Sequence, residues 1–307
     1  MKKSMAVVTG ATGFIGSYVA KKLIDHGWRV VAIVREESVN SKRLPRHKNM
    51  EVITGDLNAP MAWTNQLQKF QPKVFYHLAW TGVGNTDRNS YEQIKNISSS
   101  LATLKIAKEI GCTRWVSTGS QAEYGPVANI ISETTMTQPT TAYGHSKLAV
   151  HSLSKLFGEQ LGIEVTWLRI FSTYGPGDNS GWMLTDLIRS LLKGESPVMT
   201  AGKQLWDYLY VEDAAEAIVL SGEHDKAVGT FNLGSGRVKT IREYAEIVKN
   251  IIDPHLKIQF GALPYRQDQV MHLQANIDKL TQQIGWSPRT DFEVGIQKTI
   301  NWIRNNS

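Results

Sequence analysis

The residues with the clearest chemical potential are Tyr143 and Lys147, which lie four positions apart in the run Tyr-Gly-His-Ser-Lys. That spacing places both side chains on one face of a helix. A neighbouring ammonium group favours the phenolate, so we expect Lys147 to lower the pKa of the Tyr143 phenol from about 10. Such a phenol can act as a general acid or base. Ser120, at the end of a predicted strand, could donate a hydrogen bond to a substrate oxygen and polarise a carbonyl.

A glycine-rich turn near the start of the chain carries the second chemical signal. It separates a short apolar strand from a helix that continues to Ile24, and its glycines are spaced three apart. Glycine lets the backbone approach a bulky anion, and a helix N-terminus offers free N–H groups to a pyrophosphate. The pattern predicts dinucleotide binding, with a plain strand-to-helix turn as the alternative. The predicted cofactor contacts here are Gly10, Thr12, Gly13, Phe14 and Ile15.

The end of the second predicted strand bears on the kind of dinucleotide. Arg35 stands there, and a guanidinium group binds a 2′-phosphate well, so NADP(H) is preferred over NAD(H). NAD(H) stays possible, because Glu36 could reach a ribose hydroxyl. Asp56 and Leu57 follow the third strand, which would bring Asp56 near the adenine edge.

The elements that must position these residues alternate along the first half of the chain. Apolar runs predict strands before Gly10 and at 29–34, 50–54, 74–78, 114–117 and 165–170. Helical patterns cover 61–70, 90–110 and 143–161, and a last helix spans 292–304. Strands that alternate with helices imply a parallel sheet covered on both faces. The fold class is therefore α/β, a doubly wound parallel sheet (Rossmann) with its ligand site at the strand C-termini.

Composition excludes several other classes. The chain has 307 residues, and its net charge of +6 is spread along it without a basic cluster interleaved with aromatics, so we expect no nucleic-acid partner. The single cysteine, Cys112, suits a reducing cytoplasm. No run reaches the roughly 20 apolar residues that span a bilayer, so we expect no membrane partner. No Cys/His spacing predicts a metal site.

Taken in order, the motifs resemble the extended short-chain dehydrogenase/reductase family, in its NAD(P)-dependent nucleotide-sugar epimerase, dehydratase and reductase branch. The resemblance covers nearly the whole chain and includes the glycine turn, the Tyr-Lys pair and the runs at 168–176, 210–215 and 232–236. It implies that Ser120 is the catalytic Ser/Thr and that Tyr143 and Lys147 also touch the cofactor. It further implies cofactor contacts at Leu78 and Ala79, in the run His77-Leu78-Ala79, and at Asn96 on the next helix.

The same resemblance implies a smaller, discontinuous α/β domain that binds a nucleotide-diphosphate sugar. The dinucleotide-binding domain would be 1–171 plus about 202–234, and the substrate domain about 172–201 plus 235–307. Arg266, followed by Asp268, would contact the diphosphate, and the loop 81–87 would border the sugar. The helices at 90–110 and 143–161 imply a homodimer. The substrate-binding positions are Ser120, Gln121, Ser172, Trp206 and Arg266.

Departures from the family pattern narrow the chemistry. Gln121 and Ala122 stand where 4,6-dehydratases carry Asp and Glu, and Ala122 replaces the cysteine of 3,5-epimerase-reductases. Ser172 replaces a frequent Asn. Trp206 replaces the usual Arg and could stack on a base or sugar, or fill core.

Hydride transfer at one carbon is the simplest chemistry that remains. We expect a cytoplasmic, NADP(H)-preferring reductase of a nucleotide-linked 4-keto-6-deoxy sugar. Ser120 and Tyr143 would bind the C4 carbonyl, Tyr143 would protonate the developing alkoxide, and Lys147 would bind the nicotinamide ribose. The alternative is a nucleotide-sugar 4-epimerase with tightly bound NAD, and a remote alternative is a non-catalytic NADP(H)-binding sensor.

Overall fold

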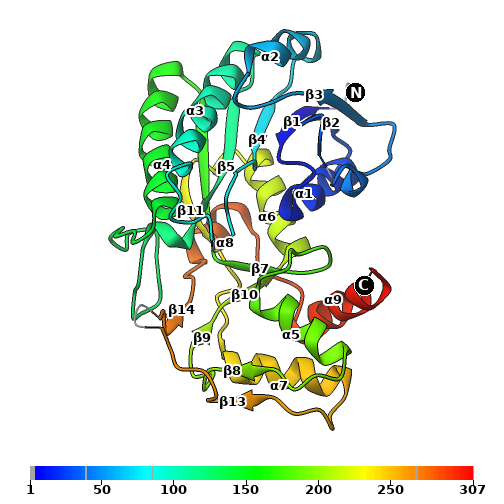
Figure 1. The fold of residues 1–307 in the computed structure, drawn as a ribbon. Coiled ribbons are helices and arrows are strands. Elements are labelled where there is room, and N and C mark those ends of the chain that lie inside the picture. The colour runs from blue at the N-terminus through cyan, green and yellow to red at the C-terminus, as the bar shows by residue number, and fades with distance from the viewer. Residues whose placement is uncertain (1–3, 39, 85, 267–268, 307) are drawn as a thin grey trace.

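A seven-stranded parallel sheet forms the middle layer of the larger, upper part of the molecule in Figure 1. The computed structural model describes residues 4–38, 40–84, 86–266 and 269–306. The strand order is β11-β6-β5-β4-β1-β2-β3, and every neighbouring pair is parallel. The strands are β1 (Met5–Thr9), β2 (Arg29–Val34), β3 (Met50–Thr54), β4 (Val74–His77), β5 (Arg114–Ser120), β6 (Glu164–Ile170) and β11 (Gly229–Leu233).

Helices cover both faces of this sheet because side chains alternate along each strand. On β1, Ala6 and Val8 pack with α1 (Phe14–Asp25), α6 (Val211–Glu223) and α8 (Asp278–Ile284). Met5 and Val7 point to the opposite face, which is covered by α2 (Met61–Leu67), α3 (Gln93–Glu109) and α4 (Ala142–Leu161). The doubly wound α/β fold predicted from the sequence is confirmed.

A smaller α/β part lies below the C-terminal edge of the sheet in Figure 1. It contains a three-stranded sheet in the order β12-β9-β14 and the strand pairs β10-β7 and β13-β8. Its own apolar core joins α5, α7 and α9. Its elements are β7 (Ser172–Tyr174), α5 (Met183–Leu192), β8 (Val198–Met199), β9 (Leu205–Trp206), β10 (Tyr208–Tyr210), β12 (Lys239–Thr240), α7 (Ile241–Ile252), β13 (Gln259–Phe260), β14 (His272–Leu273) and α9 (Phe292–Asn306).

Two contacts cross the domain boundaries expected from the sequence. The strand β9 pairs with β12 and β14 of the smaller part, although it falls within 202–234. The helix α8 packs its Leu280 and Ile284 into the core that holds Phe231 and Leu233 of β11, although it falls within 235–307. The division into a cofactor domain and a substrate domain stays a prediction.

Most predicted elements agree with the structure within a few residues. The expected strands at 29–34 and 50–54 match β2 and β3, and the fifth strand runs on to Ser120. The expected helix at 61–70 is an α-helix followed by the 3-10 turn η2 (Gln68–Phe70). The strand β11 was not predicted as a member of the sheet, because five residues that include a glycine and a buried asparagine carry little periodicity.

Candidate active site

The glycine turn brings the start of α1 close against the end of β4. Gly10 has a φ of +76°, and a Cβ on it would lie 2.6 Å from the Ala79 nitrogen. A Cβ on Gly16 would lie 2.0 Å from the Gly10 carbonyl oxygen. Only glycine fits at either position, which leaves bare backbone at the N-terminus of α1.

No side chain among the described residues caps α1, whose N-cap is Gly13, and its first turn holds no acidic residue. Free N–H groups and the positive end of the helix dipole therefore face outward beside Thr12, Phe14 and Ile15. A pyrophosphate is the group that such an end binds. We call the turn at residues 10–13 and the N-terminus of α1 the glycine cradle. This cradle fits the dinucleotide predicted from the sequence.

The ends of β2 and β3 are where the adenosine half was expected. Arg35 directly follows β2 and is exposed. Nearby, the Ser38 hydroxyl donates to the Thr12 hydroxyl at 3.1 Å and ties this loop to the glycine turn. Asp56 is exposed after β3, and its Oδ1 accepts from the Asn58 N–H at 2.8 Å. Leu57 packs into the core beneath this edge.

Asn96 on α3 holds the chain that follows β4. Its carboxamide accepts from the Thr81 N–H and donates to the Thr81 carbonyl, both at 3.0 Å. This pairing fixes the segment directly after Leu78 and Ala79. The structure therefore assigns Asn96 to positioning this loop, and its direct contact with a cofactor stays a prediction.

Ser120, Tyr143 and Lys147 come together at the C-terminal edge of the sheet. Ser120 ends β5, and its hydroxyl lies close enough to the Tyr143 phenol to lower the pKa of that group. Lys147 is 4% exposed, and its Nζ donates to the Thr118 carbonyl at 2.7 Å. The same Nζ lies 3.7 Å from the centre of the Trp80 ring. A hydroxyl, a phenol and an ammonium group thus line one buried spot beside the glycine cradle.

The pKa of the Tyr143 phenol differs from the expectation. Burial raises it above its ordinary value, while the Ser120 hydroxyl and the Arg88 guanidinium lower it. Lys147 is not the cation nearest this ring, since its Nζ lies 5.9 Å from the ring centre and the Arg88 Cζ lies 4.6 Å away. The expectation that Lys147 lowers this pKa is therefore wrong for the chain without ligand.

The pKa of Lys147 is itself lowered, to about 7, by burial, and Glu123 partly opposes this. Its protonation can therefore change near neutral pH.

Glu123 is hydrogen-bonded to the backbone of Ser120, and it was not identified as a site residue from the sequence. It is fully buried, and its carboxylate accepts from the Arg169 Nε at 2.7 Å and the Trp167 Nε1 at 3.0 Å. It also accepts from the Ser120 N–H at 2.9 Å, which completes a capping box on the 3-10 turn η3 (Gln121–Glu123). The spacing Ser-x-x-Glu at 120–123 is the sequence signature that could have revealed it.

The predicted substrate residues lie in three places. The Trp206 Nε1 donates to the Ser172 hydroxyl at 2.7 Å, so these two positions act as one unit. Gln121 is partly exposed beside Ser120. Arg266 is exposed on the segment before β14, and Asp268 lies outside the described residues. Their contacts with a substrate stay predictions.

Asp207, next to Trp206, serves the fold. It is buried, and it accepts from the backbone N–H groups of Ser235, Gly236 and Ala275. It therefore joins the end of β9 to two other segments of the chain.

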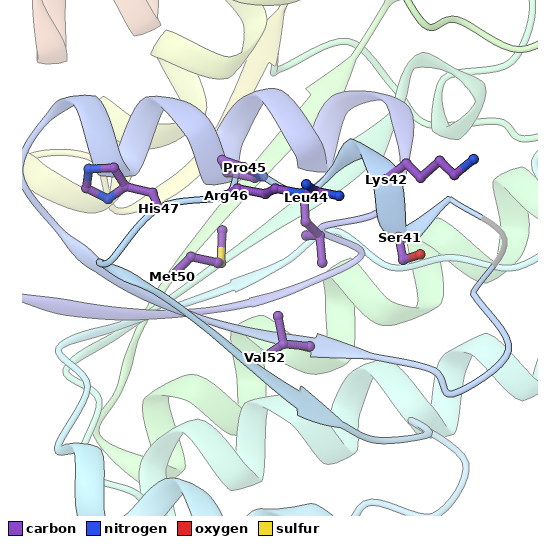
Figure 2. Close-up of a pocket in the computed structure, with 8 residues that line it drawn as sticks. All are labelled: Ser41, Lys42, Leu44, Pro45, Arg46, His47, Met50 and Val52. Atoms are coloured by element: carbon purple, nitrogen blue, oxygen red, sulfur yellow. The ribbon is translucent and has the colours of Figure 1, made fainter.

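A surface hollow of about 350 Å³ lies elsewhere, between the segment 41–47 and the edge strand β3 (Figure 2). It is lined by Ser41, Lys42, Leu44, Pro45, Arg46, His47, Met50 and Val52. None of these belongs to the predicted site.

In the described part of the chain, no group of three or more His, Cys, Asp or Glu side chains could hold a metal ion. Within the same residues, no helix is both long and apolar enough to cross a bilayer.

A doubly wound sheet with a glycine cradle and a Ser-Tyr-Lys cluster at its C-terminal edge defines a dinucleotide-dependent enzyme of the short-chain dehydrogenase/reductase type. A family model described as "NAD dependent epimerase/dehydratase family" matches residues 6–234. The chain belongs to this family and is an enzyme of its nucleotide-sugar branch.

Three similar proteins illustrate that branch. UDP-glucuronic acid decarboxylase 1 of Arabidopsis thaliana is 30% identical over 99% of this chain and 71% of its own length. The structure of UDP-N-acetylglucosamine 4-epimerase from Methanobrevibacter ruminantium M1, in complex with UDP-N-acetylmuramic acid, matches with a TM-score of 0.89, 29% identity and full coverage of both chains. The structure of MoeE5 in complex with UDP-glucose and NAD matches with a TM-score of 0.84 and 27% identity over 99% of each chain.

Proposed function

We propose that this protein is an NAD-dependent nucleotide-sugar 4-epimerase. The observation that carries the proposal is the cluster of Ser120, Tyr143 and Lys147 beside the glycine cradle, with no other acid or base at the two positions after Ser120. These three side chains can bind one oxygen atom of a sugar and transfer a proton at it. The similar 4-epimerase from M. ruminantium and the NAD in the MoeE5 complex favour this function over the reductase.

The residues of the chain would divide the work as follows. The N-terminus of α1 and its bare glycines would hold the pyrophosphate, and Lys147 would bind the nicotinamide ribose. When bound, NAD supplies the group that takes hydride from C4 and returns it to the opposite face. Tyr143 would accept the proton of the C4 hydroxyl and later give it back, and Ser120 would donate a hydrogen bond to the same oxygen. Their burial would limit the access of water to that oxygen.

The preference for NADP(H) rested on Arg35. That side chain is exposed, the family is NAD-dependent, and NADP(H) preference finds no support in the related proteins. We therefore assign NAD to the proposed 4-epimerase. A C4 reductase is the second candidate, because the same three catalytic residues would serve it.

A homodimer and a cytoplasmic location also remain proposals. The apolar side chains Ile94 on α3 and Leu156 on α4 are 50% and 47% exposed, which supports pairing through these two helices. The substrate role of Ser172, Trp206 and Arg266 remains part of the same proposal.

The test uses UDP-glucose and UDP-N-acetylglucosamine with the purified protein and no added cofactor. We expect the 4-epimer to appear in the NMR spectrum and NAD to be released when the protein is denatured. In a parallel assay with a nucleotide-linked 4-keto sugar and added NADPH, consumption of NADPH in step with product would instead establish the reductase. Tyr143→Phe should lower turnover at least about 100-fold and keep bound NAD. Tyr91→Phe, which removes a hydroxyl from an exposed ring, is the matched control.

A further inference from the structure

The loop before α3 caps the helix that carries Tyr143. The Tyr143 N–H donates to the Arg88 carbonyl at 2.8 Å, and the Ala142 N–H donates to the Asn89 Oδ1 at 3.1 Å. The Gly144 N–H is taken by the Thr141 hydroxyl at 3.1 Å. Thr141 is the N-cap of α4 itself, whereas the bonds to Arg88 and Asn89 come from the loop. Because the first N–H groups of a helix lack partners within it, these two bonds fix the loop to the start of α4.

The same docking sets the Arg88 guanidinium on the ring of Tyr143. Its Cζ lies 4.6 Å from the ring centre, well within the range of a cation–π contact. The other cation in reach, Lys147, is 5.9 Å from that centre and is held by the Thr118 carbonyl and the Trp80 ring. Arg88 is therefore the principal positive charge at the phenol.

The groups that face the phenol come from α4, β5, η3 and the loop before α3. Lys147 lies on its own helix, and the Ser120 hydroxyl and Glu123 come from β5 and η3. Glu123 disfavours the phenolate, but its charge is compensated by the buried Arg169. Arg88, from the loop, is the group that can offset the free-energy cost of ionising the phenol in a buried position. A positive charge within about 4–6 Å favours an ionised acid.

We propose that Arg88 is a positioning residue for the catalytic phenol, placed on the Tyr143 ring by the cap of α4 so that the phenolate is favoured. The proposal rests on the proposed function only for the identity of the sugar hydroxyl whose proton Tyr143 accepts. The charge on the phenol is a property of the chain itself and can be measured without a substrate.

The first experiment is an alkaline titration of the holoenzyme by ultraviolet difference absorption. The difference between the parent and Tyr143→Phe isolates the ionisation of Tyr143. We expect Arg88→Gln to raise the midpoint of that ionisation by about one pH unit, and Arg88→Lys to leave it near the parent value. Asn89→Ala removes one bond of the cap but keeps the Arg88 charge and the bond from the Tyr143 N–H to the Arg88 carbonyl, so it should move the midpoint less than Arg88→Gln.

Two results of this titration would overturn the proposal. One is an unchanged midpoint in Arg88→Gln. The other is a parent in which Tyr143 does not ionise before the protein unfolds in alkali. Neither result depends on the sugar, so the proposal and the 4-epimerase function fail separately.

The second experiment follows turnover against pH. Arg88→Gln should lose about tenfold in turnover at neutral pH and recover as the pH rises. Raising the pKa of the phenol by one unit lowers the phenolate fraction about tenfold at any pH below the midpoint. Arg88→Lys should rescue most of that loss. The same loss at every pH would mean that Arg88 only shapes the loop, and it would refute the proposal.

Discussion

Replacing Glu123 with glutamine should destabilise the protein more than any surface charge change. Glu123 is 0% exposed and Arg169 is 3% exposed, and their ion pair is 2.7 Å long. Glutamine keeps the shape and can still accept a hydrogen bond, but it leaves the buried guanidinium without a counter-charge. Breaking one partner of a buried pair costs about 3–5 kcal/mol. We expect the free energy of unfolding to fall by that amount.

The assay is urea denaturation at a fixed NAD concentration, because ligand binding shifts apparent stability. The matched control is Glu109→Gln, which breaks the exposed pair with Lys105 on α3 and should cost at most about 0.5 kcal/mol. The double variant Glu123→Gln with Arg169→Gln removes both charges. It should be less destabilised than the sum of the single variants, by about 2 kcal/mol or more.

A loss below about 1 kcal/mol in Glu123→Gln would refute the reasoning, because it would show that the buried Arg169 guanidinium does not depend on the charge of Glu123. Additive single variants would refute it as well, since they would show that Glu123 and Arg169 do not act on each other.

Two further predictions concern the cofactor and the pH dependence of stability. Gly16→Ala would place a Cβ 2.0 Å from the Gly10 carbonyl oxygen, and overpacking of this kind costs about 1–3 kcal/mol. NAD affinity by fluorescence titration should therefore fall about tenfold, whereas Gly84→Ala, in open space, should leave it unchanged. Burial lowers the pKa of His77 to about 3, so His77 stays neutral in the fold and takes up a proton on unfolding below about pH 6.5. Stability should therefore fall as the pH drops from about 6.5 toward 3, and the urea midpoint of His77→Asn should fall less steeply. Equal slopes in the parent and the variant would contradict this assignment.

Much of the fold could be predicted because its signals are local. The strands β2 and β3 are short apolar runs, and α4 shows a helical period between a Thr N-cap and a terminal glycine. The strand β11 escaped prediction because its place in the sheet depends on pairing with β6, which no local pattern encodes.

The candidate site likewise has features that local spacing predicts and features that only contacts through space establish. Spacing alone put Tyr143 and Lys147 on one helical face, and the parallel sheet then required Ser120 to end at the same edge. Spacing could not show that the Trp206 Nε1 would bond to the Ser172 hydroxyl, since the two residues lie on different strands and pair only through space.

By itself, the sequence determined the class of fold and predicted the glycine cradle and the candidate catalytic residues, because these signals rest on residue type and short-range spacing. The tertiary structure decided the electrostatics. It placed Arg88, from a distant loop, on the ring of Tyr143, and it buried Glu123 against Arg169 beneath Ser120. A pKa depends on burial and on charges brought close in space, and only the folded chain establishes either.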